Sequence, residues 1–284
     1  MQCGNPECGL ALKPCQNSTQ FAACNMAIAA DETNQVQCRY CRLNRLLPDL
    51  SISACLEQWK RLEAAKHRTL AAMEAAGFSL LNLPSSVAPL SFEFKDDVNG
   101  PVVTGHLKGC ITIHLKEADS VFREVNRVEF GEPQRTLIGH FRHELGHYYW
   151  DALVAPSRLK DFRRLFGNES NQAYNVAIQN YYNSDPPADW SSRFVSAYAS
   201  MHPWEDFAET FGLYLDLCAV LATEEHFSDD YSNSSNFASM LQRYRDIGVR
   251  VNELNRDMGL QDLVPEVLND TIADKLGFVH SLRN

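Results

Sequence analysis

Two histidines and a glutamate stand at a spacing that suits metal-assisted hydrolysis. In the segment GHFRHELGHYYWD, His143 and His147 are four residues apart and Glu144 follows the first of them. On a helix, side chains four apart project from one face, so the two imidazoles can share one zinc ion. The Glu144 carboxylate lies one position round, where it can hold and deprotonate a water on the metal. The pattern H-E-x-x-H therefore predicts a catalytic zinc site.

A catalytic zinc needs a third protein ligand, and the sequence offers several. The extended pattern H-E-x-x-H-x-x-G-x-x-H is excluded, because Trp150 and Leu153 stand at its glycine and final histidine positions. Downstream, Glu205 and Glu209 are four apart on a second expected helix. One of these carboxylates can bind zinc while the other orients a ligand imidazole. The rival third ligands are His202, Asp206 and Asp151.

Six of the nine cysteines lie within the first 41 residues: Cys3, Cys8, Cys15, Cys24, Cys38 and Cys41. In a reducing compartment such a cluster indicates metal rather than disulfides. Cys38 and Cys41 form a C-x-x-C pair, and Cys15 with Cys24 can complete a structural zinc site of four thiolates. Cys3 and Cys8 could be half of another ribbon, or could replace Cys15 and Cys24.

Composition and charge limit the functional classes that remain. The 284 residues are 45% hydrophobic, which is ordinary globular composition. No apolar run has membrane-spanning length and MQCGNPECGL has no signal-peptide pattern, so no membrane contact and a cytoplasmic location are expected. The formal net charge of −10 divides into +2 for residues 1–70 and −12 for the rest. An acidic chain of this kind disfavours general binding to nucleic acid.

The elements that must position these residues form an α+β arrangement. Residues 1–48 have too few apolar side chains for a core of their own, so a small zinc-ribbon domain is expected there. Residues 49–83 are expected to form a linking helix, with one apolar stripe and with Lys and Arg on its other side. Residues 84–284 are expected to form a mostly helical, zincin-like domain with a small antiparallel or mixed sheet.

Three short strands are predicted at 90–94, 102–106 and 109–115. Asn99-Gly100 is expected to make a hairpin turn between the first two. The third strand is a candidate edge to which an extended peptide could add, and an interior place in the sheet fits it equally well. Helices are expected at 132–156, opened by Glu132-Pro133, and then at 157–166, 170–182, 203–222, 234–257 and 266–282.

The motif E-x-F-A-E-x-F, which runs from Glu205 to Phe211, resembles the third-ligand helix of the lethal-factor type of gluzincin. This resemblance implies that Glu205 binds zinc and that Glu209 supports a ligand. It also implies that a tyrosine seven residues before the ligand faces the metal. That residue is Tyr198, whose phenol would donate a hydrogen bond to the developing oxyanion. A tyrosine that only packs ahead of the helix is the alternative interpretation.

Longer segments extend the resemblance to nearly the whole chain. They are CRLNRLLPDL, TGH at 104–106, EADSVFRE at 117–124, RTLIGHFRHELGHYYWD, FRRLFG at 162–167 and VSAYASMHPWEDFAE. Together they are similar to a bacterial family of zinc-binding metallopeptidases that carry an N-terminal zinc ribbon. Family members usually begin with a fuller ribbon than Cys3 and Cys8 provide.

The sequence therefore predicts a zinc-dependent peptidase that acts on a peptide or protein, with one catalytic and one structural zinc ion. One alternative is a nucleic-acid-associated zinc-ribbon protein whose protease domain is secondary or regulatory, because RYCRLNR places three arginines and Tyr40 beside the C-x-x-C pair. Another is a non-catalytic scaffold stabilised by metal. Glu144 argues against the scaffold, which has no need of a base.

Overall fold

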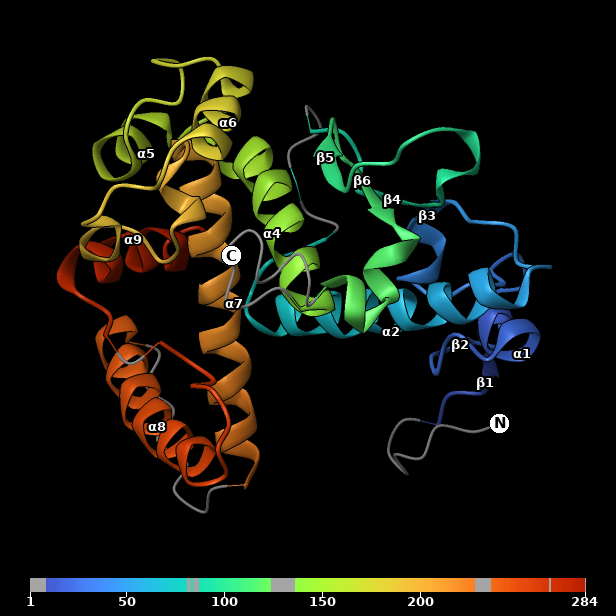
Figure 1. Cartoon of the computed structure of the whole chain (residues 1–284). Coiled ribbons are helices and arrows are strands. Elements are labelled where there is room, and N and C mark those ends of the chain that lie inside the picture. The colour runs from blue at the N-terminus through green and yellow to red at the C-terminus, as the bar shows by residue number, and fades with distance from the viewer. Residues whose placement is uncertain are drawn as a thin grey trace. The chain divides into compact units, whose positions relative to one another are not determined.

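The computed structural model describes residues 9–80, 83, 87–123, 136–227, 236–265 and 267–283. Cys3, Cys8 and Glu132-Pro133 lie outside these residues. The chain divides into two compact units, Met1–Ala71 with Pro84–Tyr148, and Ala72–Leu83 with Tyr149–Asn284. Helices dominate and the sheets are small, which confirms the expected α+β class (Figure 1). Among the described helices, none is long and apolar enough to cross a membrane.

The cysteine-rich segment of the first unit has little regular structure. Strand β1 (Leu12–Pro14) pairs antiparallel with β2 (Ala27–Ala29), and the short helix α1 (Gln16–Phe21) lies between them in sequence. A 3-10 turn at Cys41–Leu43 then leads directly into β3 (Asn44–Leu46). Few apolar side chains are buried in this segment, so its fold depends on the cysteines.

The larger sheet has the strand order β3-β4-β6-β5. Strand β4 (Ser91–Lys95) is parallel to both β3 and β6 (Cys110–His114). Strand β5 (Gly105–Leu107) is antiparallel to β6 and lies at the edge of the sheet. The strand predicted at 109–115 is therefore β6, and it lies inside the sheet, between β4 and β5, rather than at its edge.

The hairpin expected at Asn99-Gly100 is wrong, because β4 pairs with β6 rather than with β5. The side chain of Asp96 instead accepts a hydrogen bond from the amide of Val98 and caps a 3-10 turn. Gly109 has φ +82°, and a Cβ there would lie 2.8 Å from the carbonyl oxygen of Pro89. Glycine therefore lets the chain enter β6 closely beside the residues that precede β4.

Helix α2 (Ser53–Ala75) forms where a linking helix is predicted. Trp59, Leu62 and Leu70 are fully buried on its apolar stripe, as periodicity indicates. The expectation that its lysines all lie on an outer face is wrong, because Lys66 is fully buried. Its charge is satisfied inside the first unit by the polar network described below.

Helix α4 (Leu137–Tyr149) carries the H-E-x-x-H motif. The hydroxyl of Thr136 accepts a hydrogen bond from the amide of Gly139 at 2.9 Å and caps the helix start. Phe141 is buried and packs edge-on against Phe92 of β4, so this helix is fixed on the sheet. The chain continues as a π-helix at Trp150–Val154 instead of ending as one α-helix at Pro156.

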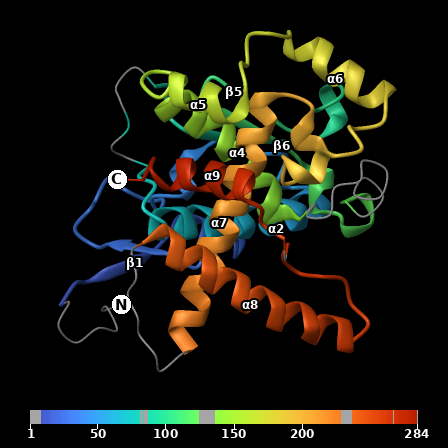
Figure 2. The ribbon, with the colours of Figure 1, turned by 90° about the vertical axis from the view of Figure 1, so that its left-hand side faces the viewer.

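The second unit consists mainly of helices, at places close to the predicted ranges. They are α5 (Leu159–Phe166), α6 (Tyr174–Asn183), α7 (Pro203–Phe227), α8 (Phe237–Asp257) and α9 (Asp270–His280). Helices α8 and α9 both pack on α7 (Figure 2). Phe207 of α7 contacts Phe162 and Phe166 of α5 and Phe278 of α9, so an aromatic core holds the beginning of α7.

Candidate metal centres

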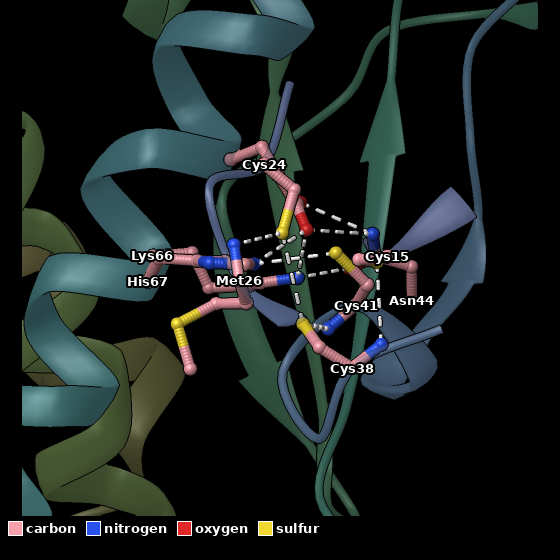
Figure 3. Close-up of polar contacts among 9 residues, drawn as sticks. Cys15, Cys24, Met26, Cys38, Cys41, Asn44, Lys66 and His67 are labelled. Atoms are coloured by element: carbon pink, nitrogen blue, oxygen red, sulfur yellow. Dashed lines mark hydrogen bonds and ion pairs between the residues drawn. The ribbon is translucent and has the colours of Figure 1, made fainter. Parts of the chain in front are cut away.

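Four cysteine sulfur atoms come together in the first unit, those of Cys15, Cys24, Cys38 and Cys41 (Figure 3). All four lie within 4.8 Å of one another, and no disulfide joins the described cysteines. The Sγ atoms of Cys24 and Cys38 are 3.8 Å apart. A tetrahedron with metal–sulfur bonds of about 2.3 Å has edges of about 3.8 Å. The cluster therefore fits a closed zinc site with four protein ligands.

Main-chain amides support these thiols. The amide of Met26 donates to Cys24 Sγ at 3.3 Å, the amide of Cys38 to Cys15 Sγ at 3.2 Å, and the amide of Cys41 to Cys38 Sγ at 3.5 Å. A hydrogen bond with the Cys41 thiol, opposed by burial, lowers the pKa of Cys38 to about 4. Burial raises the pKa of Cys24 to about 12. The surroundings therefore favour the thiolate form of Cys38, the form that binds metal.

A buried polar network from α2 continues the cysteine cluster (Figure 3). His67 Nε2 lies 3.4 Å from Cys41 Sγ and 3.2 Å from Glu63 Oε1. The Lys66 ammonium lies 2.8 Å from Glu63 Oε1 and donates to the side-chain oxygen of Asn44. The Asn44 amide nitrogen in turn donates to both Glu63 oxygens at 3.1 Å. The network ties α2 to the residues that follow the C-x-x-C pair.

The charges in this network oppose a second metal ion there. Cys41, Glu63 and His67 place three ligand atoms close enough together for a cation. However, the Lys66 ammonium already sits against Glu63, and the rings of Phe92 and Phe94 lie 5.3 and 5.7 Å from it. Burial acts to raise the pKa of Glu63, but Lys66 and His67 outweigh it and lower that pKa. Glu63 thus stays ionised as the partner of Lys66.

The H-E-x-x-H residues lie together on α4 and are candidates for a different kind of metal site. The Nε2 atoms of His143 and His147 are 3.1 Å apart. Zinc–nitrogen bonds of about 2.0–2.1 Å place tetrahedral ligands about 3.3 Å apart, so the pair fits one shared ion. Glu144 is buried, and its Oε2 has no hydrogen-bond partner among the described residues. Because an unpartnered buried carboxylate oxygen is unfavourable, this position suits a bound water.

His140 and Glu117 lie beside this motif and have no predicted role. His140 Nδ1 is 3.0 Å from Glu117 Oε2, and Glu117 is buried. His140 is four residues before Glu144, so both lie on one face of α4. The segments that contain them, EADSVFRE and RTLIGHFRHE, contribute to the family resemblance, but their spacing alone gives no sign that they pair.

His106 of the edge strand β5 is a second residue without a predicted role. Its Nε2 accepts a hydrogen bond from the Gly109 amide at 3.0 Å, and its ring lies 5.9 Å from the Tyr148 ring of α4. Burial, reinforced by His147, lowers the pKa of His106 to about 4. The imidazole is therefore neutral at physiological pH. It corresponds to the histidine of the TGH segment.

Glu205 and Glu209 lie on α7 in the second unit. Glu205 is 1% exposed, and the Tyr174 phenol donates a hydrogen bond to its Oε1 at 2.8 Å. Glu209 Oε2 accepts a hydrogen bond from the Ser196 hydroxyl at 2.8 Å. Burial and the neighbouring Glu205 raise the pKa of Tyr198 well above 10, so this phenol keeps its proton and can donate a hydrogen bond. Tyr174 is absent from the predicted site, because no local spacing relates it to Glu205.

Of the three rival third ligands, His202 and Asp206 have other partners in this unit. Both ring nitrogens of His202 are hydrogen-bonded to main-chain groups at 3.1 Å. Asp206 is fully buried and lies 2.6 Å from the ammonium of Lys275. Asp151 is exposed on the π-helix that follows α4. Glu205 and Glu209 therefore remain the better candidates on chemical grounds.

Comparison with known proteins identifies the family. Residues 55–282 match the family described as "Putative zinc-binding metallo-peptidase", and residues 4–52 match a zinc-ribbon domain. The chain belongs to this metallopeptidase family.

Two relatives are uncharacterized proteins, one of Mycobacterium bovis and one of Mycobacterium tuberculosis. Each is 35% identical to the chain over 274 residues, which cover 92% of the chain and 80% of the relative. No solved structure matches the chain significantly.

Proposed function

We propose that the protein is a zinc-dependent peptidase in which His143, His147 and Glu205 bind one zinc ion and Glu144 is the base. The facing imidazole nitrogens, 3.1 Å apart beside the unpartnered buried oxygen of Glu144, carry the proposal. Two histidines leave a catalytic zinc one protein ligand short. Glu205 supplies a buried carboxylate within a helix that resembles the gluzincin third-ligand helix. Membership of the metallopeptidase family supports the same reaction class.

The zinc ion, when bound, supplies a Lewis acid that lowers the pKa of water to roughly 7 and polarises the scissile carbonyl. Glu144 accepts the proton of the attacking water and then passes it to the leaving amine. Tyr198 donates a hydrogen bond to the developing oxyanion, because its raised pKa keeps the phenol protonated. Glu209 orients a ligand imidazole.

The substrate is a peptide or protein that binds in an extended form along β5. Among the described strands, β5 pairs only with β6, so its other side is available for main-chain hydrogen bonds. The antiparallel direction of β5 relative to β6 distinguishes this edge from the β3 edge of the same sheet. His106 belongs to this strand and lies near Tyr148 of α4, which connects the edge with the helix that carries Glu144.

We propose that the zinc of the ribbon is structural rather than part of a nucleic-acid site. Tyr40, the aromatic residue that could stack on a base, is 5% exposed and packs against the ring of His67. Arg45 of the basic segment lies 3.1 Å from Glu93. The one aromatic residue of RYCRLNR is therefore packed inside the first unit, and Arg45, although exposed, is paired with a carboxylate.

Glu144→Gln tests the catalytic proposal. The variant is expected to retain zinc and to lose hydrolysis by roughly 10²–10⁴-fold, because an amide cannot accept the proton of the water. Zinc content is measured by mass spectrometry, and hydrolysis by the new N-termini formed in a proteome-derived peptide mixture. Glu57→Gln, an exposed glutamate of α2, is the matched control and keeps full activity. Normal turnover by Glu144→Gln would overturn the mechanism.

A further inference from the structure

Helix α6 reaches a buried carboxylate of α7 through one side chain. Ala177 is the only residue of α6 that is buried, so the helix lies largely at the surface of the second unit. Tyr174, its first residue, is 38% exposed, yet its phenol lies 2.8 Å from Oε1 of Glu205, which is 1% exposed. A hydrogen bond from a phenol to a buried carboxylate is charge-assisted and stronger than one between neutral groups.

The ring of Tyr174 is held in place from two sides. It contacts the ring of His202 at 5.6 Å and that of Trp204 at 5.5 Å, edge-on in both cases. His202 is itself fixed by its two main-chain hydrogen bonds. The orientation of the Tyr174 side chain is therefore fixed by its contacts with His202 and Trp204 and not only by helix α6. Such support is what a residue needs in order to orient another side chain.

Tyr198 has different surroundings, although it too lies near Glu205. Its ring packs edge-on against Tyr181 of α6 at 5.6 Å, and the residue is half-buried. Tyr174, by comparison, is half-exposed and donates a hydrogen bond to Oε1 of Glu205. Both tyrosines lie near Glu205, and they can have different roles there.

We propose that Tyr174 is a positioning residue that orients the Glu205 carboxylate for metal binding. This inference rests on the proposed function, in which Glu205 is the third zinc ligand. Carboxylates that bind metal are themselves held by hydrogen bonds, and removing such a partner typically weakens metal binding by roughly 10–100-fold. Because Tyr174 acts through the ligand rather than on the substrate, its loss lowers metal affinity and kcat and leaves KM nearly unchanged.

Tyr174→Phe tests this inference, because it removes the hydroxyl and keeps the ring packing. The full-length protein is first loaded with one equivalent of Zn²⁺, which fills the four-cysteine site, and the second site is then titrated with Co²⁺. The Co²⁺ affinity is measured by chelator competition, and the visible spectrum reports the geometry of the second site. We expect Co²⁺ binding to weaken by roughly 10–100-fold with a changed spectrum. Tyr182→Phe, an exposed tyrosine of the same helix, is the matched control and leaves both unchanged.

Glu205→Gln and the double variant separate this inference from the proposed function. If Glu205→Gln weakens Co²⁺ binding and Tyr174→Phe does not, Tyr174 has no positioning role, while the proposed ligand set stands. If Glu205→Gln binds Co²⁺ as tightly as the wild type, the proposed ligand set fails and this inference fails with it. If both single variants weaken binding, Tyr174→Phe should add no further loss to Glu205→Gln. Independent, additive losses would contradict an action of Tyr174 through Glu205.

Discussion

The two candidate metal centres of the chain differ in how many ligands one region supplies. The ribbon brings four sulfur atoms together within residues 15–41, which saturates a tetrahedral ion and leaves no open position. Helix α4 brings together two imidazoles and a buried glutamate oxygen without a partner among the described residues. A closed set of ligands suits an ion that stabilises a fold, and an incomplete set suits an ion that must also hold a substrate or water.

Cys38→Ser and His143→Ala test this comparison most directly and should give the largest difference in stability. Cys38→Ser is expected to lose the ribbon zinc and to unfold that region, because zinc binding supplies its folding free energy, about 10–16 kcal/mol in small zinc fingers. His143→Ala is expected to lose the other zinc ion with little change in melting temperature. Zinc stoichiometry by mass spectrometry and thermal unfolding measure the two effects. A metal-free wild-type protein would overturn both assignments, and equal destabilisation by the two variants would remove the contrast.

Lys66→Met sharpens the comparison by testing the network beside the ribbon. Lys66–Glu63 and Lys60–Glu57 are both three residues apart on α2 with contacts of 2.8 Å, but the first pair is fully buried and the second is exposed. Removing Lys66 leaves the Glu63 carboxylate buried without its main cation, at an expected cost of about 3–5 kcal/mol. Lys60→Met is the matched control, with an expected cost of about 0–1 kcal/mol. Urea unfolding of both variants measures the difference, and equal values would show that burial of the pair has no energetic consequence.

Asp206→Asn is expected to have a smaller effect that depends on pH. Burial raises the pKa of Asp206 to about 7, although Lys275 acts to lower it. Between about pH 4 and pH 7 the folded state therefore binds more protons than the unfolded state, and stability falls as pH rises. The loss is at most about 1.4 kcal/mol per pH unit. Asp206→Asn should flatten this slope in urea unfolding measured across that range, and an unchanged slope would contradict the raised pKa.

Glu63 gives the opposite sign in the first unit. Its pKa is lowered by Lys66 and His67, so its contribution to stability is complete above its ordinary pKa and is lost as the pH falls further. The two buried carboxylate–lysine pairs therefore respond to pH in opposite directions. The difference arises because His67 acts together with Lys66 to lower the pKa of Glu63, whereas burial acts together with the neighbouring Glu209 to raise the pKa of Asp206.

The predictable parts of the molecule are those set by short spacings. Within each short motif the two ligands lie together because they are only three or four residues apart in sequence. The helices are predictable from their 3.6-residue hydrophobic period. The parallel pairing of β4 with β6 depends on a crossover, and a hairpin signal at Asn99-Gly100 pointed to the wrong partner. Burial of Lys66 depends in part on Asn44, 22 residues away, and the Tyr174–Glu205 bond spans 31 residues. Patterns within a short window contain no information on such contacts.

The position of β3 has a practical consequence for dissecting this protein. Strand β3 follows the C-x-x-C cysteines immediately and also forms one edge of the four-stranded sheet, parallel to β4. A fragment that starts at residue 49, where sequence composition suggests a cut, would lack this strand. The hydrogen-bonding groups of β4 that face β3 would then lie open, and an uncovered edge of a sheet readily pairs with other chains. Aggregation of such a fragment would report the lost edge strand rather than any weakness of the helices that follow.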